Sequence, residues 1–281
     1  KQYSGIYSTT QILVAMTQNN VKYMANTTSE MFNKDFAFHW QRWDNSIVRS
    51  WKDFADQFLS IPMAHQMSTN YMILDGTSNR QSLKVMRPYQ VYATQKIINK
   101  LKHVDFDNAI NKVGYVWHTT GSGKTITSFK SAWLASRLPN VDKVIFVVDR
   151  IQLTKQTSES YRAYDPEADM TMFSRLGSIA DTENTNDLNR QLKSKGRNII
   201  VTSVQKLNTL VSRKSVKLPD KNYGFIVDEA HRSTGGESFD LIQKAFKGAA
   251  WVGYTGTPMF DDTTSGLRTK DIFGPLLHAY T

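Results

Sequence analysis

The sequence contains no cysteine. Disulfide bonds and thiolate metal sites are therefore excluded, although this absence does not identify a reducing compartment. No window approaches the roughly 20 uninterrupted apolar residues that a membrane-spanning helix needs, so we expect no membrane partner. The opening residues, Lys-Gln-Tyr-Ser-Gly, show neither an initiator methionine nor a signal-peptide pattern. We therefore expect an internal piece of a larger protein.

Positive charge is in excess. The 281 residues include 35 Lys and Arg against 25 Asp and Glu, which gives a formal net charge of +10. Such an excess favours polyanionic partners, because each cation placed on a phosphate releases counterions. A surface that is basic only for solubility would give the same number, so charge alone does not decide the function.

The character of the chain changes near residue 85. Before it, residues 11–24 resemble a hairpin with a polar turn, and residues 35–40 alternate aromatic and other residues as a strand would. After it, apolar runs alternate with helical segments; these runs are 113–117, 144–148, 198–202, 223–227 and 249–254. Such runs are typical of a parallel sheet covered by helices on both faces. We predict a smaller α+β segment at 1–85 and an α/β domain at 86–281.

The strongest local pattern is His118-Thr-Thr-Gly-Ser-Gly-Lys-Thr125, which follows an apolar run and opens a helix. Glycines allow the backbone to fold tightly, so that amide hydrogens point at phosphate oxygens beside a helix N-terminus. Lys124 can reach the β- and γ-phosphates, and the Thr125 hydroxyl can bind Mg²⁺. The residues predicted to bind ATP here are Thr119, Thr120, Gly121, Ser122, Gly123, Lys124 and Thr125. His118 replaces the usual first glycine.

An acidic partner follows later in the chain. Asp228-Glu229-Ala-His231 comes directly after the apolar run 223–227, at the sheet edge where α/β domains bind ligands. We expect Asp228 to hold Mg²⁺, Glu229 to activate the attacking water, and His231 to sense the γ-phosphate. In isolation a solvated Asp-Glu pair explains this segment equally well, but its pairing with a phosphate loop favours catalysis.

Three further segments complete the pattern. Arg87 and Gln90 precede the phosphate loop, and the Gln90 amide offers the donor and acceptor that read an adenine edge. Strand ends carry residue types that contact nucleic-acid backbones; these are Arg150, Thr202 and Gln205. Two hydroxyls around a glycine suit a hinge that couples the nucleotide to a neighbouring surface; this hinge is Thr255, Gly256 and Thr257.

In this order, these motifs resemble those of the first RecA-like P-loop domain of superfamily 2 helicases and translocases. The resemblance covers residues 86–281. The segments around Lys124, Arg150 and Asp228, and the stretch 271–280, look most like the motor subunit of type I restriction enzymes. Residues 24–28 and 31–38 resemble the tail of that subunit's nuclease domain.

The resemblance implies ATP-dependent DNA translocation that drives restriction, with ATP and Mg²⁺ as cofactors. It also implies double-stranded DNA and the specificity and methyltransferase subunits as partners, in the bacterial cytoplasm. The family's nuclease motif, Asp-x-Lys or Glu-x-Lys, is absent from the sequence, so we expect the nuclease residues upstream. In this superfamily, a second RecA-like lobe supplies the arginine that stabilises charge in the transition state of hydrolysis. We expect that lobe to be missing from this chain. The chain alone should therefore bind ATP weakly and hydrolyse it poorly.

Other functions fit parts of the pattern. Another superfamily 2 DNA or RNA helicase would carry the same motifs. A nucleic-acid-binding module switched by ATP would not need Glu229, and a metabolic kinase would need neither the acidic segment at 228–231 nor the hinge at 255–258. The six histidines lack the spacing of zinc ligands.

Overall fold

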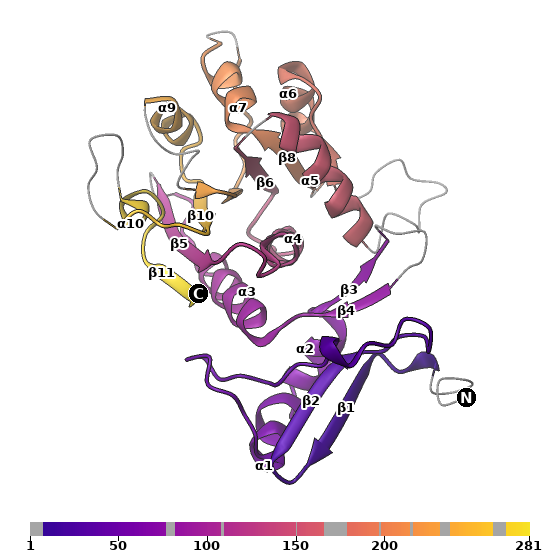
Figure 1. The fold of residues 1–281 in the computed structure, drawn as a ribbon. Helices are drawn as coiled ribbons and strands as arrows, with labels where there is room; N and C mark the ends of the chain where they lie inside the picture. The colour runs from indigo at the N-terminus through magenta and orange to yellow at the C-terminus, as the bar shows by residue number, and fades with distance from the viewer. Residues whose placement is uncertain are drawn as a thin grey trace. The chain divides into compact units, whose positions relative to one another are not determined.

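The computed structural model describes residues 8–76, 82–107, 110–149, 151–165, 179–196, 198–213, 216–230, 237–260 and 268–281. The chain divides into two compact units, residues 1–92 and residues 93–281. Helix α3 (Pro88–Leu101) contains the boundary between them. Figure 1 shows the elements of both units in chain order.

The first unit combines short helices with two antiparallel strand pairs. Strands β1 (Ile12–Thr17) and β2 (Asn20–Ala25) form the expected hairpin, in which Thr17 pairs with Asn20. Strands β3 (Met72–Asp75) and β4 (Ser82–Val85) form the second pair. The helical elements are η2 (Lys34–Phe36), α1 (Trp51–Phe54), η3 (Ala55–Leu59) and α2 (Met63–Thr69).

The prediction of a strand at residues 35–40 was wrong. Residues Lys34–Phe36 form a 3-10 turn, because the Asn33 side chain accepts a hydrogen bond from the Asp35 amide and caps it. Phe36 is 59% exposed, whereas Trp40 is buried and its ring lies 5.2 Å from that of Phe58. The aromatic residues of this segment therefore do not share one packed face.

The second unit is built on a seven-stranded sheet with the order β11-β5-β10-β9-β6-β8-β7, in which every neighbouring pair is parallel. Its strands are β5 (Asn111–His118), β6 (Lys143–Val148), β7 (Ile179–Asp181), β8 (Ile199–Ser203), β9 (Tyr223–Val227), β10 (Ala250–Thr255) and β11 (Leu276–Tyr280). Strands β6, β8, β9 and β10 are buried at every residue. This arrangement confirms the predicted α/β fold, and it brings all the carboxyl ends of the strands to one edge.

Helices connect these strands and pack against the sheet (Figure 1). They are α4 (Lys124–Ala135), α5 (Ile151–Tyr164), α6 (Thr185–Lys193), α7 (Val204–Val211), α9 (Glu237–Ala245) and α10 (Thr269–Phe273). In the core the rings of Phe225 and Trp251 stack with centroids 4.0 Å apart. A side chain at Gly253 would come within 2.9 Å of the Phe273 ring, so glycine is needed for this packing.

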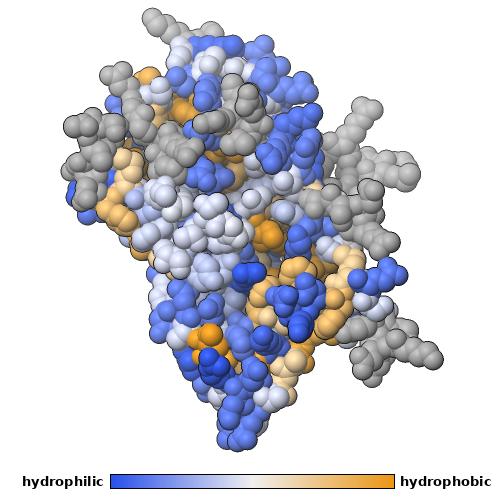
Figure 2. Space-filling view, viewed as in Figure 1, coloured by the Kyte–Doolittle hydropathy of each residue, from blue (hydrophilic) through white to orange (hydrophobic). Residues whose placement is uncertain are grey.

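The described helices include none that is long and apolar enough to span a membrane. Figure 2 shows hydrophilic side chains over much of the visible face, with hydrophobic patches between them.

Candidate nucleotide site

The predicted phosphate loop lies between the end of β5 and the start of α4. Gly121 and Gly123 have φ angles of +83° and +78°, which L side chains rarely adopt. The Ser122 amide and hydroxyl both donate to the Thr119 carbonyl, at 3.2 and 2.6 Å, and close the turn. Thr120 lies in this turn, and Thr125 is exposed in the first turn of α4. The loop therefore has the tight, glycine-dependent backbone that phosphate binding requires.

Lys124 is the first residue of α4, and its side chain is 12% exposed. Its ammonium Nζ lies 3.4 Å from the His118 carbonyl and 3.8 Å from Oε1 of Glu229. The phosphate loop and the acidic segment, which are far apart in the sequence, thus meet at one side chain. A cation at the N-terminus of a helix attracts anions, because its charge adds to the partial positive charge of the helix end.

The acidic pair follows β9 directly. The Asp228 amide donates to the Val147 carbonyl at 2.9 Å, and the Glu229 amide donates to Oδ1 of Asp228 at 3.0 Å. Glu229 has a φ of +46°, which is uncommon for a residue with a side chain and marks local strain. Burial and the neighbouring Glu229 raise the pKa of Asp228 to about 6.

The donor set suits a hard divalent cation. Two adjacent carboxylates repel each other, which contributes to the raised pKa of Asp228, and a bound cation would relieve this repulsion. Within the described residues, no group of three or more His, Asp or Glu side chains could hold a metal alone. Mg²⁺ would therefore also need oxygens from phosphates and water, which is its usual preference.

The predicted hinge lies against the phosphate loop. The Trp117 indole donates to the Gly256 carbonyl at 3.1 Å, and a Cβ at Gly256 would come within 3.2 Å of the Lys124 ammonium. Thr255 is fully buried, and its hydroxyl accepts a hydrogen bond from the Thr257 amide at 3.1 Å. Thr257 itself is exposed.

The predicted adenine-reading residues belong to the first unit. Gln90 is 5% exposed, and its Oε1 accepts a hydrogen bond from the Arg87 amide at 2.9 Å. This bond satisfies a free amide at the start of α3. The Arg87 guanidinium lies 4.4 Å from the centroid of the Phe38 ring. Nucleotide contacts from both residues stay a prediction.

The predicted nucleic-acid contacts differ in their exposure. Thr202 is fully buried within β8, so its side chain does not lie at a surface that a phosphate backbone could reach. Gln205 is exposed on α7, and its amide donates to the Asp149 carbonyl at 3.1 Å. Of these two residues, only Gln205 is available to DNA. Arg150 and His231 lie outside the described residues.

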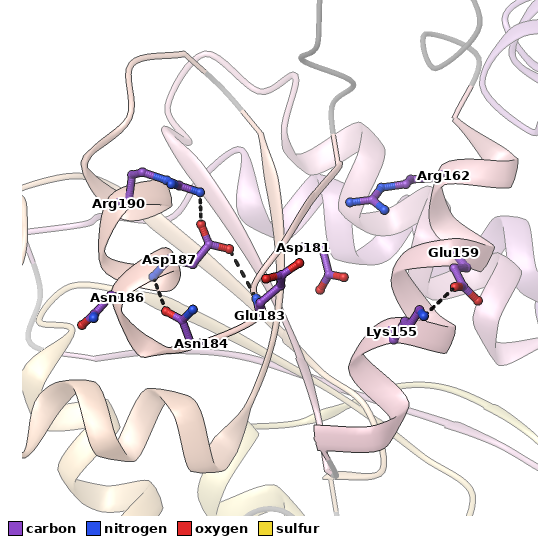
Figure 3. A pocket seen from close by; sticks show the side chains of 9 residues that line it. All are labelled: Lys155, Glu159, Arg162, Asp181, Glu183, Asn184, Asn186, Asp187 and Arg190. Atoms are coloured by element: carbon purple, nitrogen blue, oxygen red, sulfur yellow. Dashed lines mark hydrogen bonds and ion pairs between the residues drawn. The ribbon is translucent and has the colours of Figure 1, made fainter.

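A separate hollow of about 730 Å³ lies between α5 and the segment from β7 to α6 (Figure 3). Its side chains carry charges of both signs, with four carboxylates and three cations; they are Glu159, Asp181, Glu183, Asp187, Lys155, Arg162 and Arg190, together with Asn184 and Asn186. Some of these charges pair locally, as in Arg190 with Asp187. The hollow has no cationic excess and is not a second phosphate site.

Sequence reasoning missed the contribution of β11. His118 is fully buried, so its side chain does not face the phosphates, and its Nε2 lies 3.3 Å from Nδ1 of His278. The Thr119 amide donates to the Tyr280 carbonyl at 3.1 Å. The signal for β11 was weak because the strand is short and has an exposed residue at its start.

Comparisons with known proteins agree on a family. Residues 89–281 match the family model of the SWI2/SNF2 ATPase. The chain is 34% identical over 285 residues to a type I restriction enzyme endonuclease subunit of Staphylococcus saprophyticus, covering all of this chain and 29% of the relative. It is 39% identical over 219 residues to the C-terminal part of a putative type I restriction enzyme endonuclease of Mycoplasma pneumoniae, covering 74% of this chain and 99% of that protein.

A solved structure supports the fold. The ATP-dependent Type ISP restriction-modification enzyme LlaBIII bound to DNA superposes with a TM-score of 0.50 at 18% identity, covering 73% of this chain and 16% of that chain. The present chain spans less than a third of the length of the staphylococcal relative. Its match to the family model and its identity to these relatives place it in the SWI2/SNF2 ATPase family, among the endonuclease subunits of type I restriction enzymes.

Proposed function

We propose that this chain supplies the ATP-binding lobe of a type I restriction subunit that translocates double-stranded DNA. One observation carries the proposal. Nζ of Lys124 lies 3.4 Å from the His118 carbonyl at the start of the phosphate loop and 3.8 Å from Oε1 of Glu229. A nucleotide site needs only the loop, whereas hydrolysis also needs a carboxylate beside it. Membership of the SWI2/SNF2 ATPase family supports ATP as the nucleotide.

Each residue has a separate task in this proposal. Lys124 and the amides of residues 119–125 hold the phosphates, and the hydroxyl of Thr125 with the carboxylate of Asp228 would hold Mg²⁺. When bound, Mg²⁺ neutralises phosphate charge during hydrolysis. Glu229 orients a water and accepts its proton, while Thr255, Gly256 and Thr257 transmit the state of the nucleotide.

The partners follow from the family. Relatives are subunits of type I restriction enzymes, and LlaBIII has been solved bound to DNA. The net charge of +10 suits a polyanion. We therefore propose duplex DNA as the track, and specificity and methyltransferase subunits as the assembly partners. Residues 1–85 would belong to the nuclease domain.

The test uses a full-length subunit that carries this chain, assembled with its partner subunits. ATPase rates are measured with duplex DNA, single-stranded DNA and RNA, and translocation is measured by displacement of a triplex-forming strand. We expect stimulation mainly by duplex DNA and its loss in Lys124→Ala. Lys193→Ala, which removes an exposed lysine at the end of α6, is the control and should behave as wild type.

Two outcomes would replace the proposal. Stronger stimulation by RNA than by duplex DNA would indicate another superfamily 2 helicase. Tight ATP binding without hydrolysis under any of these conditions would indicate a module that ATP switches.

A further inference from the structure

The phosphate loop starts from a strand end that is held from two sides. On one side, β11 pairs with β5 so that Tyr280 lies opposite His118, and the Thr119 amide donates to the Tyr280 carbonyl at 3.1 Å. On the other side, β10 pairs with β5, and the Trp117 indole donates to the Gly256 carbonyl at 3.1 Å. Successive residues of a strand point to opposite faces, so Trp117 and His118 anchor the strand end on different faces of the sheet.

The contact on the β11 side includes a pair of buried imidazoles. Nε2 of His118 lies 3.3 Å from Nδ1 of His278, and the two side chains are 0% and 3% exposed. A hydrogen bond between two imidazole nitrogens needs one proton, so one ring donates and the other accepts. The rings meet edge to face, with centroids 5.5 Å apart.

Both rings are uncharged at neutral pH. Burial, the neighbouring His278 and Lys124 lower the pKa of His118 to about 3. Burial and Lys96 lower the pKa of His278 to about 4. The pair therefore acts as a fixed hydrogen bond and not as a charge that switches in the physiological range.

The backbone of His118 connects this pair to the nucleotide site. Its carbonyl accepts from the Lys124 ammonium at 3.4 Å, so the position of His118 sets where that ammonium rests. We propose that His278 is a positioning residue of the nucleotide site: through the His118 ring it fixes the strand end that carries the phosphate loop and the carbonyl that holds Lys124. The inference rests on the proposed binding of ATP by this loop.

The experiment measures the Kd of mant-ATP and the thermal stability of the full-length subunit. His278→Leu removes the ring nitrogens and should raise the Kd about tenfold, because one buried hydrogen bond is lost at the base of the loop. His278→Asn places an amide near the position of Nδ1 and should keep the Kd within about twofold of wild type. His278→Gln extends its amide further and should behave like His278→Leu.

If His278 only stabilised the fold, its variants would lower the Tm without changing the Kd of mant-ATP. The control is Lys143→Met, which removes contacts of a buried lysine to Ser194 and Asn198 at the opposite edge of the sheet. It should lower the Tm without changing the Kd. If folded His278→Leu or His278→Gln keeps the wild-type Kd, the positioning role is overturned.

A last variant separates this inference from the proposed function. If Lys124→Ala binds mant-ATP as wild type does, the nucleotide site itself is wrongly assigned. If Lys124→Ala loses binding while the folded His278 variants retain it, only the positioning role fails. A double variant, His118→Leu with His278→Leu, should raise the Kd no further than either single change, because the two rings share one contact.

Discussion

The ammonium of Lys124 lies 3.8 Å from Oε1 of Glu229. The cation proposed to bind phosphate and the carboxylate proposed as the base therefore form an ion pair in this structure. Under the proposed function, an incoming phosphate would compete with Glu229 for Lys124 and would free the carboxylate for a water molecule. Binding and activation of the base would then be one event.

Glu229→Gln tests this relationship. The amide keeps the size of the side chain and removes its charge, so Lys124 becomes fully available to phosphate. We expect ATP to bind as tightly as in wild type or more tightly, while hydrolysis falls at least about a hundredfold because general base catalysis is lost. Equilibrium binding and single-turnover hydrolysis measure the two effects. Weakened binding in Glu229→Gln would show that the carboxylate does not compete for Lys124.

Asp228 should make the stability of the nucleotide-free protein depend on pH. Its pKa is raised from 3.8 to about 6, chiefly by burial and then by Glu229, so the folded protein binds this proton more tightly than the unfolded chain does. Stability from this group is present at low pH and is lost as the pH rises from about 4 to about 6. Because asparagine does not ionise, Asp228→Asn should not show this loss of stability as the pH rises.

We therefore expect Asp228→Asn to raise the Tm at pH 7.5, to raise it less at pH 4.5, and to abolish Mg²⁺-dependent hydrolysis. Thermal unfolding of both proteins across this range tests the claim. A lower Tm of the variant at pH 7.5 would mean that the carboxylate stabilises the fold.

Gly256→Ala should disturb Lys124 without disturbing the fold. The new Cβ would lie 3.2 Å from the lysine ammonium, which sits at the end of a flexible side chain and can move. We expect the KM for ATP to rise several-fold with little change in Tm. Gly253→Ala is the matched control, since its Cβ would lie 2.9 Å from the packed Phe273 ring. That change should lower the Tm and leave the KM unchanged.

Gln90 combines a structural and a predicted recognition task, which two substitutions separate. Gln90→Glu keeps an oxygen for the Arg87 amide and loses the donor that adenine would need. Gln90→Ala loses both. We expect both variants to lose the preference for ATP over GTP, and Gln90→Ala, which also loses the bond to the Arg87 amide, to lower stability by about 1 kcal/mol. Unchanged selectivity in Gln90→Glu would remove Gln90 from the nucleotide site.

Gln205 and Thr202 make opposite predictions for DNA binding. Gln205→Ala removes an exposed amide and should weaken DNA-stimulated ATPase by a few-fold. Thr202→Val replaces a fully buried residue with one of the same shape and should leave DNA stimulation unchanged. Titration of the ATPase rate with duplex DNA compares them. A larger effect from Thr202→Val would place the DNA path elsewhere.

The sequence predicted those features that depend on the residue types of one short segment. The glycines predicted a tightly folded loop, in which Gly121 and Gly123 have positive φ angles, and the apolar runs predicted the parallel strands. It could not show which strands are neighbours, because sheet order depends on packing between distant segments. The contact between Trp117 and Gly256, and that between His118 and His278, follow from that order alone.

Exposure was the second quantity that residue types did not reveal. Thr202 and Gln205 are polar residues three positions apart, yet the first is buried in β8 and the second is exposed on α7. Phe36 likewise resembled a packed strand residue, but a capped turn turns it toward solvent. In each case the element in which the residue lies decided its exposure: a buried strand for Thr202, a helix for Gln205 and a capped turn for Phe36.

The sheet order also determines when the nucleotide site can form during folding. Strand β5 carries the phosphate loop, but its two neighbours, β10 and β11, come last among the strands in the chain. Contacts across such long separations close late, because loop entropy must first be overcome. A nascent chain that ends before residue 250 would contain the whole glycine-rich segment but would lack β10 and β11, the two strands that flank β5. ATP should therefore protect the finished domain from unfolding and give little help to its partly synthesised precursors.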